Sequence, residues 1–229
     1  MNIAENLKTI NENIARAAQK SGRRAEDITL IAVTKSVEPT VLQNEINTLL
    51  AAGVRNFGEN RVQELSAKQP LCGDGIIWHM IGNLQRNKVR NVVGHVALIH
   101  SLDSLRLAEE ISRIAVREDV VADVLIEINI AGEDTKHGIT SETAAQLAEQ
   151  VAKLPNIAIK GLMTIAPFVD DGEENRPHFS KMAHLFSDLK ADGHDMQHLS
   201  MGMTIDYEVA IEEGATMVRI GTAIFGERS

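Results

Sequence analysis

The 229-residue chain has one cysteine, Cys72, few aromatic residues (3%) and no apolar run that could cross a membrane. A lone cysteine excludes an intrachain disulfide framework and suits a reducing compartment. A membrane-spanning helix needs about 20 consecutive apolar residues. The first residues also lack the basic and apolar regions of a secretory signal. These absences predict a cytoplasmic protein without a membrane partner.

Positive charge is scarce as well: 23 Lys and Arg face 32 Asp and Glu, and the net charge is −9. Proteins that follow a phosphate backbone usually present a basic face, and single-strand binders need aromatic platforms. The one basic segment, Arg86, Lys88 and Arg90, has the spacing of a solvated helix face. We therefore expect no nucleic-acid partner.

Common catalytic and metal-binding motifs are missing too. The eight histidines form no His-Glu-x-x-His pattern, and no Gly-x-Ser-x-Gly elbow occurs. A Gly-x-Gly-x-x-Gly fingerprint and a Walker motif are also absent. We predict no metal site and assign no catalytic residue.

What the sequence does contain is a regular alternation of two patterns. Short β-branched or aliphatic runs occur at 29–35, 54–57, 76–81, 97–101, 122–130, 157–165, 197–201 and 216–220. Helical patterns lie between and around them, at 39–52, 60–68, 84–93, 104–117, 141–153, 174–191 and 205–213. An amphipathic helix is expected at 2–20, before the first strand.

Eight strand-then-helix units with strands apolar on both faces indicate a parallel sheet covered by helices. Eight units favour a closed barrel over an open sheet. No linker or composition shift divides the chain. We predict one α/β domain over residues 1–229, a single (β/α)8 TIM barrel with an additional N-terminal helix.

Functional groups of such a barrel collect at the carboxyl ends of its strands. Lys35 ends the first apolar run, where loss of hydration would lower the pKa of its amine and allow attack on a carbonyl. The alternative is a strand that ends in solvent, with Lys35 reaching outward from the rim. The second strand is expected to bring Asn56 to the same end.

The last two strands carry the pattern of a phosphate site. Ser200-Met201-Gly202 and Gly221-Thr222 follow strands seven and eight, the positions at which barrels often bind phosphate. Glycine allows the backbone to approach the anion, and the hydroxyls of Ser200 and Thr222 can donate to it. Two ordinary turns with capping hydroxyls are the alternative.

Arg219 occupies an inward position of the last strand, where an arginine needs a partner. A carboxylate such as Glu127 or Asp206 could form a structural bridge with it. Arg219 could equally donate to a ring nitrogen or a phosphate of a ligand. The residues leave both open.

Several segments in this order resemble one family, the pyridoxal phosphate homeostasis proteins. They are Ala32–Ser36, Asn56–Asn60 with Val62–Glu64, Trp78–Lys88, Gly161–Thr164, Leu199–Met203 with Asp206, Val218–Thr222 and Phe225–Arg228. The resemblance covers essentially the whole chain. Met80 and Thr204 stand where Phe and Ser are expected, and Thr204 keeps the hydroxyl.

The resemblance implies a barrel like the N-terminal domain of alanine racemases, with pyridoxal 5'-phosphate (PLP) as a Schiff base on Lys35. It implies that Arg219 faces the pyridine nitrogen, that Asn56 lies near the ring and that Met163 is also a cofactor-binding residue. The remaining cofactor-binding positions would hold the phosphate: Ser200, Met201, Gly202, Gly221 and Thr222. The family is associated with holding and supplying PLP and has no established reaction.

An arginine at the pyridine nitrogen disfavours its protonation and makes the ring a poorer electron sink. We therefore favour a non-enzymatic carrier that supplies PLP to apo-enzymes. We expect it to be a monomer, because no long exposed apolar helix stands out in the sequence. A slow PLP-dependent amino-acid racemase is the alternative. A cofactor-free Schiff-base aldolase acting on sugar phosphates also remains open.

Overall fold

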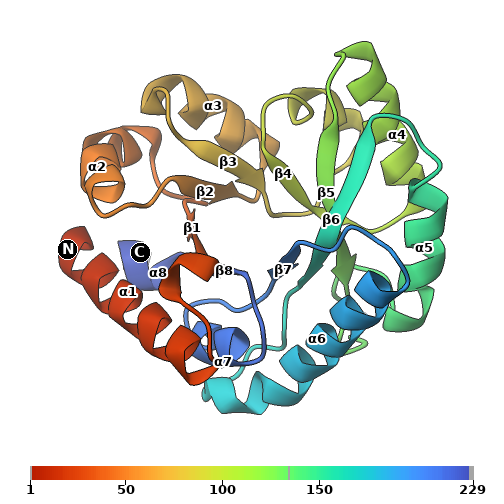
Figure 1. Ribbon diagram of the computed structural model, residues 1–229. Helices are drawn as coiled ribbons and strands as arrows, with labels where there is room; N and C mark the ends of the chain where they lie inside the picture. The colour runs from red at the N-terminus through yellow and green to blue at the C-terminus, as the bar shows by residue number, and fades with distance from the viewer. Residues whose placement is uncertain (1, 134, 227–229) are drawn as a thin grey trace.

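Eight parallel strands close into a barrel in the computed structural model, which describes residues 2–133 and 135–226. Each strand pairs with its neighbour in sequence, and β8 returns to β1 (Figure 1). The strands are β1 (Thr29–Val33), β2 (Asn56–Glu59), β3 (Ile77–Met80), β4 (Leu98–Leu102), β5 (Ala122–Ile128), β6 (Ile157–Thr164), β7 (His198–Ser200) and β8 (Met217–Ile220). The predicted TIM barrel is confirmed.

Helices surround the barrel on its outer side (Figure 1). They are α1 (Ile3–Lys20), α2 (Pro39–Ala51), α3 (Val62–Cys72), α4 (Leu105–Arg117), α5 (Ala144–Val151), α6 (Arg176–Ala191), α7 (Tyr207–Glu212) and α8 (Thr222–Phe225). Four 3-10 segments supplement them: η1 (Ala25–Asp27), η2 (Arg86–Asn91), η3 (Ser141–Thr143) and η4 (Gly172–Asn175). None of the described helices is long and apolar enough to cross a membrane.

Three predicted elements differ in detail. The helix expected at 84–93 is the short 3-10 segment η2, of which only Val89 is buried. The helix expected at 60–68 continues through Pro70 to Cys72, because Leu65, Lys68 and Cys72 form one buried face. The first strand ends at Val33, two residues before Lys35. Glu227 and Arg228 of the last resembled segment lie outside the described residues.

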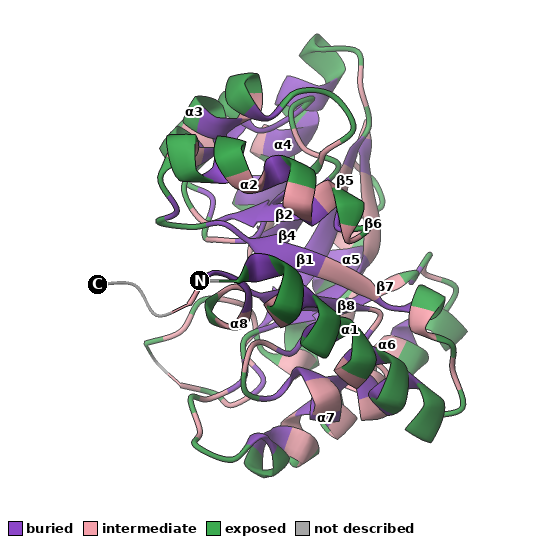
Figure 2. Ribbon diagram, turned by 90° about the vertical axis from the view of Figure 1, so that its left-hand side faces the viewer, coloured by how far each residue is buried: buried purple, intermediate pink, exposed green. Residues whose placement is uncertain are grey.

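The core has two layers, which follow from the alternation of side chains along each strand. Outward-facing strand residues such as Ala32, Phe57 and Val218 pack with the helices in one large cluster. A smaller cluster lies inside the barrel and consists of Ile31, Leu98, Leu125, Met163 and Met217. Figure 2 shows the buried strands between helices whose outer faces are exposed.

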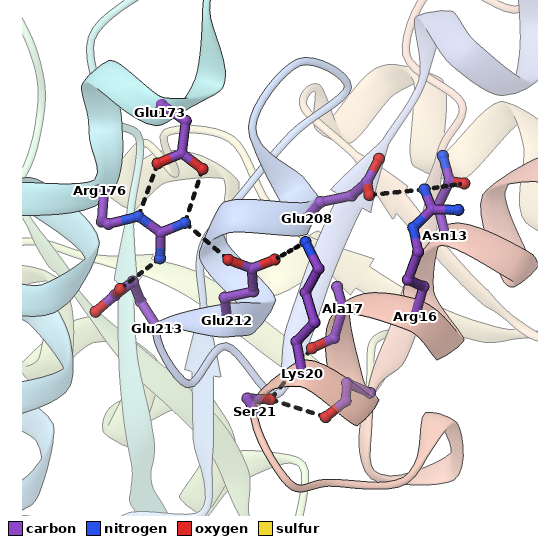
Figure 3. Close-up of polar contacts among 11 residues, drawn as sticks. Asn13, Arg16, Ala17, Lys20, Ser21, Glu173, Arg176, Glu208, Glu212 and Glu213 are labelled. Atoms are coloured by element: carbon purple, nitrogen blue, oxygen red, sulfur yellow. Dashed lines mark hydrogen bonds and ion pairs between the residues drawn. The ribbon is translucent and has the colours of Figure 1, made fainter.

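Helix α1 joins the two ends of the chain, because it packs against α7 and α8 (Figure 1). Its inner face buries Leu7, Ile10 and Ile14. Charged residues at its surface continue onto α7 and α6 (Figure 3). The contacts are Arg16–Glu208 (3.1 Å), Lys20–Glu212 (2.8 Å), and Arg176 with Glu173, Glu212 and Glu213 (2.7 Å each).

Candidate functional site at the carboxyl end of the barrel

A polar layer lies directly above the inner apolar cluster, toward the carboxyl ends of the strands. His100, Glu127 and Arg219 each follow a residue of that cluster by two positions. Since a strand repeats every two residues, these side chains also point into the barrel, one layer nearer its mouth. All three are buried. Strand periodicity therefore explains how polar groups come to lie inside the barrel.

Five side chains of this layer form a continuous hydrogen-bonded chain. Asn56 Oδ1 lies 3.0 Å from His79 Nε2, and His79 Nδ1 lies 3.0 Å from His100 Nε2. His100 Nδ1 is 3.1 Å from Ser200 Oγ, which accepts from Arg219 at 2.6 Å. The chain connects β2, β3, β4, β7 and β8. These residues are far apart in the sequence, and only the closure of the barrel brings them together.

The two ends of this chain determine the direction of its protons. Arg219 can only donate, so the Ser200 hydroxyl is free to donate to His100 Nδ1. His100 then donates from Nε2 to His79, which donates from Nε2 to the Asn56 carbonyl oxygen. Burial lowers the pKa of His79 to about 4, and burial, with His79 and Arg219 nearby, lowers that of His100 well below 6.5. Both imidazoles are therefore neutral at pH 7, as this direction requires.

Arg219 is a buried cation without a hydrogen-bonded carboxylate among the described residues. It donates to Ser200 Oγ and, at 2.8 Å, to the carbonyl oxygen of Thr164. Burial lowers its pKa to about 10, although Asp206 and Glu127 are near enough to oppose that change. The structural bridge to Glu127 or Asp206 is therefore not formed. A guanidinium has five N–H donors, so donors remain for a ligand.

Glu127 is the second unusual group of this layer. It is 5% exposed, and its Oε2 atom has no hydrogen-bond partner among the described residues. Burial and the nearby Asp103 raise its pKa to about 7, while Arg219 acts in the opposite direction. A buried carboxyl group that titrates near neutral pH is typical of a binding site.

Lys35 lies at the rim of the barrel, in the turn that follows β1. Its side chain is exposed, so the expectation that it is desolvated at a strand end is wrong. The reason is that β1 stops at Val33 and the chain leaves the barrel there. The backbone on both sides of Lys35 is nevertheless held, because the Thr34 carbonyl oxygen accepts from Lys68 and the Ser36 N–H donates to Glu64.

The loops after β7 and β8 lie side by side, and the Ala223 N–H donates to Thr204 Oγ1 at 3.4 Å. Gly202 has φ +90°, and a Cβ atom there would lie 2.6 Å from the Ala210 Cβ, so only glycine fits. Within the described residues, the N–H groups of Gly202, Gly221 and Thr222 donate to no other group. The two loops therefore hold three unpaired N–H donors, at the buried Gly202, the half-buried Gly221 and the exposed Thr222.

Three other residues predicted to bind the cofactor are buried and already make contacts within the protein. The Ser200 hydroxyl is fully buried in the chain from Asn56 to Arg219. Met201 is fully buried, and its N–H donates to the carbonyl oxygen of Met217. Met163 is part of the inner apolar cluster beneath the polar layer. Thr204 was noted in the sequence only because it keeps the hydroxyl expected in the family. Its Oγ1 atom accepts from the Ala223 N–H, in the segment that follows β8.

His79 was expected at the carboxyl end of the third strand without a stated role, and His100 was not singled out. The signal for both is a histidine within an apolar strand. No group of three or more His, Cys, Asp or Glu side chains within residues 2–133 and 135–226 is arranged for a metal ion. An open cleft of about 530 Å³ lies apart from the polar layer, lined by residues 60–64 and by Asn83, Gln85 and Lys88.

Comparison with known proteins agrees with this geometry. Residues 6–229 match the alanine racemase N-terminal domain family. A pyridoxal phosphate homeostasis protein from Aquifex aeolicus is 45% identical over 100% of this chain and 99% of its own length. The chain belongs to the pyridoxal phosphate homeostasis protein family. The resemblance inferred from the sequence is thereby confirmed.

Solved structures of the family share the fold. PipY from Synechococcus elongatus, solved with PLP bound, has a TM-score of 0.83 and 33% identity, and the match covers 98% of this chain and 100% of that chain. Alanine racemase from Clostridium difficile is 20% identical, with a TM-score of 0.77, and the match covers 98% of this chain and 57% of that chain. The racemase likeness concerns the fold alone. The curated relatives carry the name of homeostasis proteins, not of enzymes.

Proposed function

We propose that the protein binds PLP at the carboxyl end of its barrel, holds it covalently through Lys35 and supplies it to apo-enzymes. The observation that carries this proposal is Arg219, a buried cation of the polar layer that has unused N–H donors. An acceptor atom on a planar ligand, such as a pyridine nitrogen, would satisfy it. PipY, a family member, was solved with PLP bound.

The rest of the layer fits the same ligand. Unpaired N–H groups at Gly202, Gly221 and Thr222 suit a phosphate group, with hydroxyls from Thr222 and Thr204 beside them. Asn56, at the other end of the hydrogen-bonded chain, would lie beside the ring, and Met163 would support it from below. Ser200 would act through Arg219, because its hydroxyl is engaged. Met201 would contribute packing rather than a donor.

Lys35 supplies the covalent tether in this proposal. Its amine condenses with the aldehyde carbon of PLP, a C=N bond forms, and one water molecule leaves. Hydrolysis reverses the step and returns the free aldehyde. An exposed amine at the rim favours a reversible tether, because water reaches the bond. Reversible attachment is what a protein that supplies the cofactor requires.

A slow racemase is the alternative that the domain match keeps open. PLP bound here would supply an electron sink for amino-acid carbanions, but Arg219 would hold the pyridine nitrogen unprotonated. Racemisation also needs an acid and a base on opposite faces of the substrate. Glu127 is the one ionisable group of the layer whose pKa lies near neutrality. One such group cannot serve both faces of the substrate, so a carrier is favoured over a racemase.

The first experiment tests the tether. Purified protein mixed with PLP, reduced with borohydride and digested should carry the pyridoxyl group on the peptide that contains Lys35. Lys35→Ala should abolish the visible absorbance and the labelled peptide. Lys8→Ala, which removes another exposed lysine, is the matched control and should behave like wild type. Equal labelling of Lys35→Ala and wild type would refute the tether.

The second experiment tests delivery. Loaded protein is mixed with an apo-enzyme that depends on PLP, and the recovered activity is compared with that given by free PLP at the measured released concentration. If the protein delivers PLP directly, the apo-enzyme should regain activity faster than it does with the same concentration of free PLP. Exchange of an amino acid's α-hydrogen with solvent deuterium at enzymatic rates would instead favour the racemase. Light scattering checks the proposed monomer.

A further inference from the structure

A buried ion-pair cluster lies on the outer side of β1 and β2, where α3 packs against them. Lys68 of α3 has a side chain that is 1% exposed. Its Nζ atom lies 2.7 Å from Glu59 Oε1 and 3.2 Å from Glu64 Oε2. Neither the polar layer nor the proposed phosphate loops include these residues, so their role has to be found elsewhere.

The contacts of this cluster converge on the turn that carries Lys35. Lys68 Nζ donates to the carbonyl oxygen of Thr34 at 2.7 Å, and the Thr34 hydroxyl donates to Glu59 at 2.5 Å. On the other side, the Ser36 N–H donates to Glu64 Oε2 at 2.7 Å. Both neighbours of Lys35 are therefore bonded to one cluster of charges.

Ser36 shows that this turn has a conformation that needs support. Its φ is +59°, a left-handed conformation that residues other than glycine rarely adopt. Such a conformation persists where surrounding contacts determine it. The charged acceptor on the Ser36 N–H is a contact of that kind, because hydrogen bonds to ionised groups are the stronger ones.

We propose that Glu64 and Lys68 are positioning residues that aim the Lys35 amine into the barrel mouth by fixing the backbone on each side of it. This inference rests on the proposed PLP tether. Glu64 also lines the open cleft beside α3, so the cluster connects that cleft with the turn. Without it, Lys35 would keep its chemistry but lose its fixed direction.

The experiment compares Glu64→Ala with Glu110→Ala, a control that removes a similarly exposed glutamate from an ion pair on α4. Two ligands are titrated: PLP, and pyridoxine 5'-phosphate, which has no aldehyde and cannot react with Lys35. We expect Glu64→Ala to bind PLP about tenfold more weakly, the factor expected for one charge-assisted hydrogen bond. Pyridoxine 5'-phosphate should bind as to wild type, and Glu110→Ala should change neither.

Amide hydrogen exchange supplies a readout that does not depend on the cofactor. Exchange at Ser36 and Val37 should become faster in Glu64→Ala and remain unchanged in Glu110→Ala. Glu64→Gln, which keeps an oxygen for the Ser36 N–H, should recover most of the PLP affinity. Lys68→Met should repeat the pattern if its unfolding curve stays cooperative.

The outcomes separate this inference from the proposed function. If wild-type protein does not label at Lys35, the proposed tether is wrong. If wild type labels but Glu64→Ala binds PLP equally well, the positioning role is wrong. An equal loss for PLP and pyridoxine 5'-phosphate would also overturn it, because the defect would then lie in the whole site.

Discussion

Two clusters of charged residues join helices to the rest of this barrel, at very different depths. In the Lys68 cluster between α3 and the first two strands, Lys68 is 1% and Glu59 0% exposed, and Glu64 (23%) reaches the surface. The Arg176 cluster at the junction of α6, α7 and α1 lies at the surface, where Arg176 is 34% and Glu173 58% exposed (Figure 3). The shortest contact between charged groups is 2.7 Å in both clusters.

Equal geometry therefore does not mean equal energy. A buried charge that loses its partner remains in a medium that solvates it poorly, whereas an exposed one is rehydrated. The same reasoning applies to His79 and His100 inside the barrel, which are neutral and cannot gain a charge without cost. We expect the deep groups to control stability and its pH dependence, and the surface cluster to contribute little.

Lys68→Ala should produce the largest effect. It leaves the Glu59 carboxylate buried without its cation, which costs about 3–5 kcal/mol of unfolding free energy. Urea denaturation followed by circular dichroism measures the change. The double variant Lys68→Met with Glu59→Leu should lose clearly less, because no unpaired charge remains. A loss below about 1 kcal/mol for Lys68→Ala would place this cluster with exposed pairs.

Acid should destabilise the protein through His79. Its pKa in the folded protein is about 4, below the ordinary 6.5, mainly because of burial. The folded state therefore binds fewer protons, so stability is highest above pH 6.5 and falls by about 3 kcal/mol toward pH 4. Denaturation curves at several pH values should show this slope, and His79→Leu should flatten it. An unchanged slope in His79→Leu would assign the acid sensitivity to other groups.

Glu127 should act in the opposite direction. Its folded pKa is raised from 4.5 to about 7 by burial and Asp103, so its contribution is greatest below pH 4.5 and is lost as pH rises. Between pH 5 and pH 7 this amounts to about 2 kcal/mol. Glu127→Gln should remove that loss and be more stable than wild type at pH 7.5. Equal pH profiles would contradict the raised pKa.

Arg176→Met should have the smallest effect. Three carboxylates lie within 2.7 Å of Arg176, yet the site is partly exposed. We expect a loss of about 1 kcal/mol or less, and less still in high salt, because exposed pairs are screened. Urea denaturation at low and high salt measures it. A loss comparable to that of Lys68→Ala would remove the distinction between the two clusters.

Much of the fold could be predicted, because each barrel strand is visible in the sequence as a short apolar run. All eight apolar runs correspond to strands, and the N-terminal helix lies where its apolar spacing predicts. The failures are instructive. The stretch at 84–93 forms only a 3-10 segment at 86–91, although Leu84, Val89, Val92 and Val93 are buried. The helix through Pro70 is held by its packing face, which overrides a local signal against helix.

The site could be predicted only in part. Lys35, Gly202 and Arg219 stand out because a lysine, a glycine and an arginine are conspicuous at the ends of apolar runs. Lys68 does not stand out, since a lysine on a helix is normally solvated, and its burial depends on how α3 packs. The two histidines meet only because β3 and β4 are neighbours in register.

The sequence by itself determined the barrel, the family and the end of the barrel at which the polar residues gather. It could do so because strand and helix periods are local properties of the chain. Only the tertiary structure decided which polar groups meet, that Lys35 is exposed, and that Lys68 and Glu127 are buried. Burial and hydrogen bonding between distant strands depend on barrel closure and register, and these set the charge state of each group.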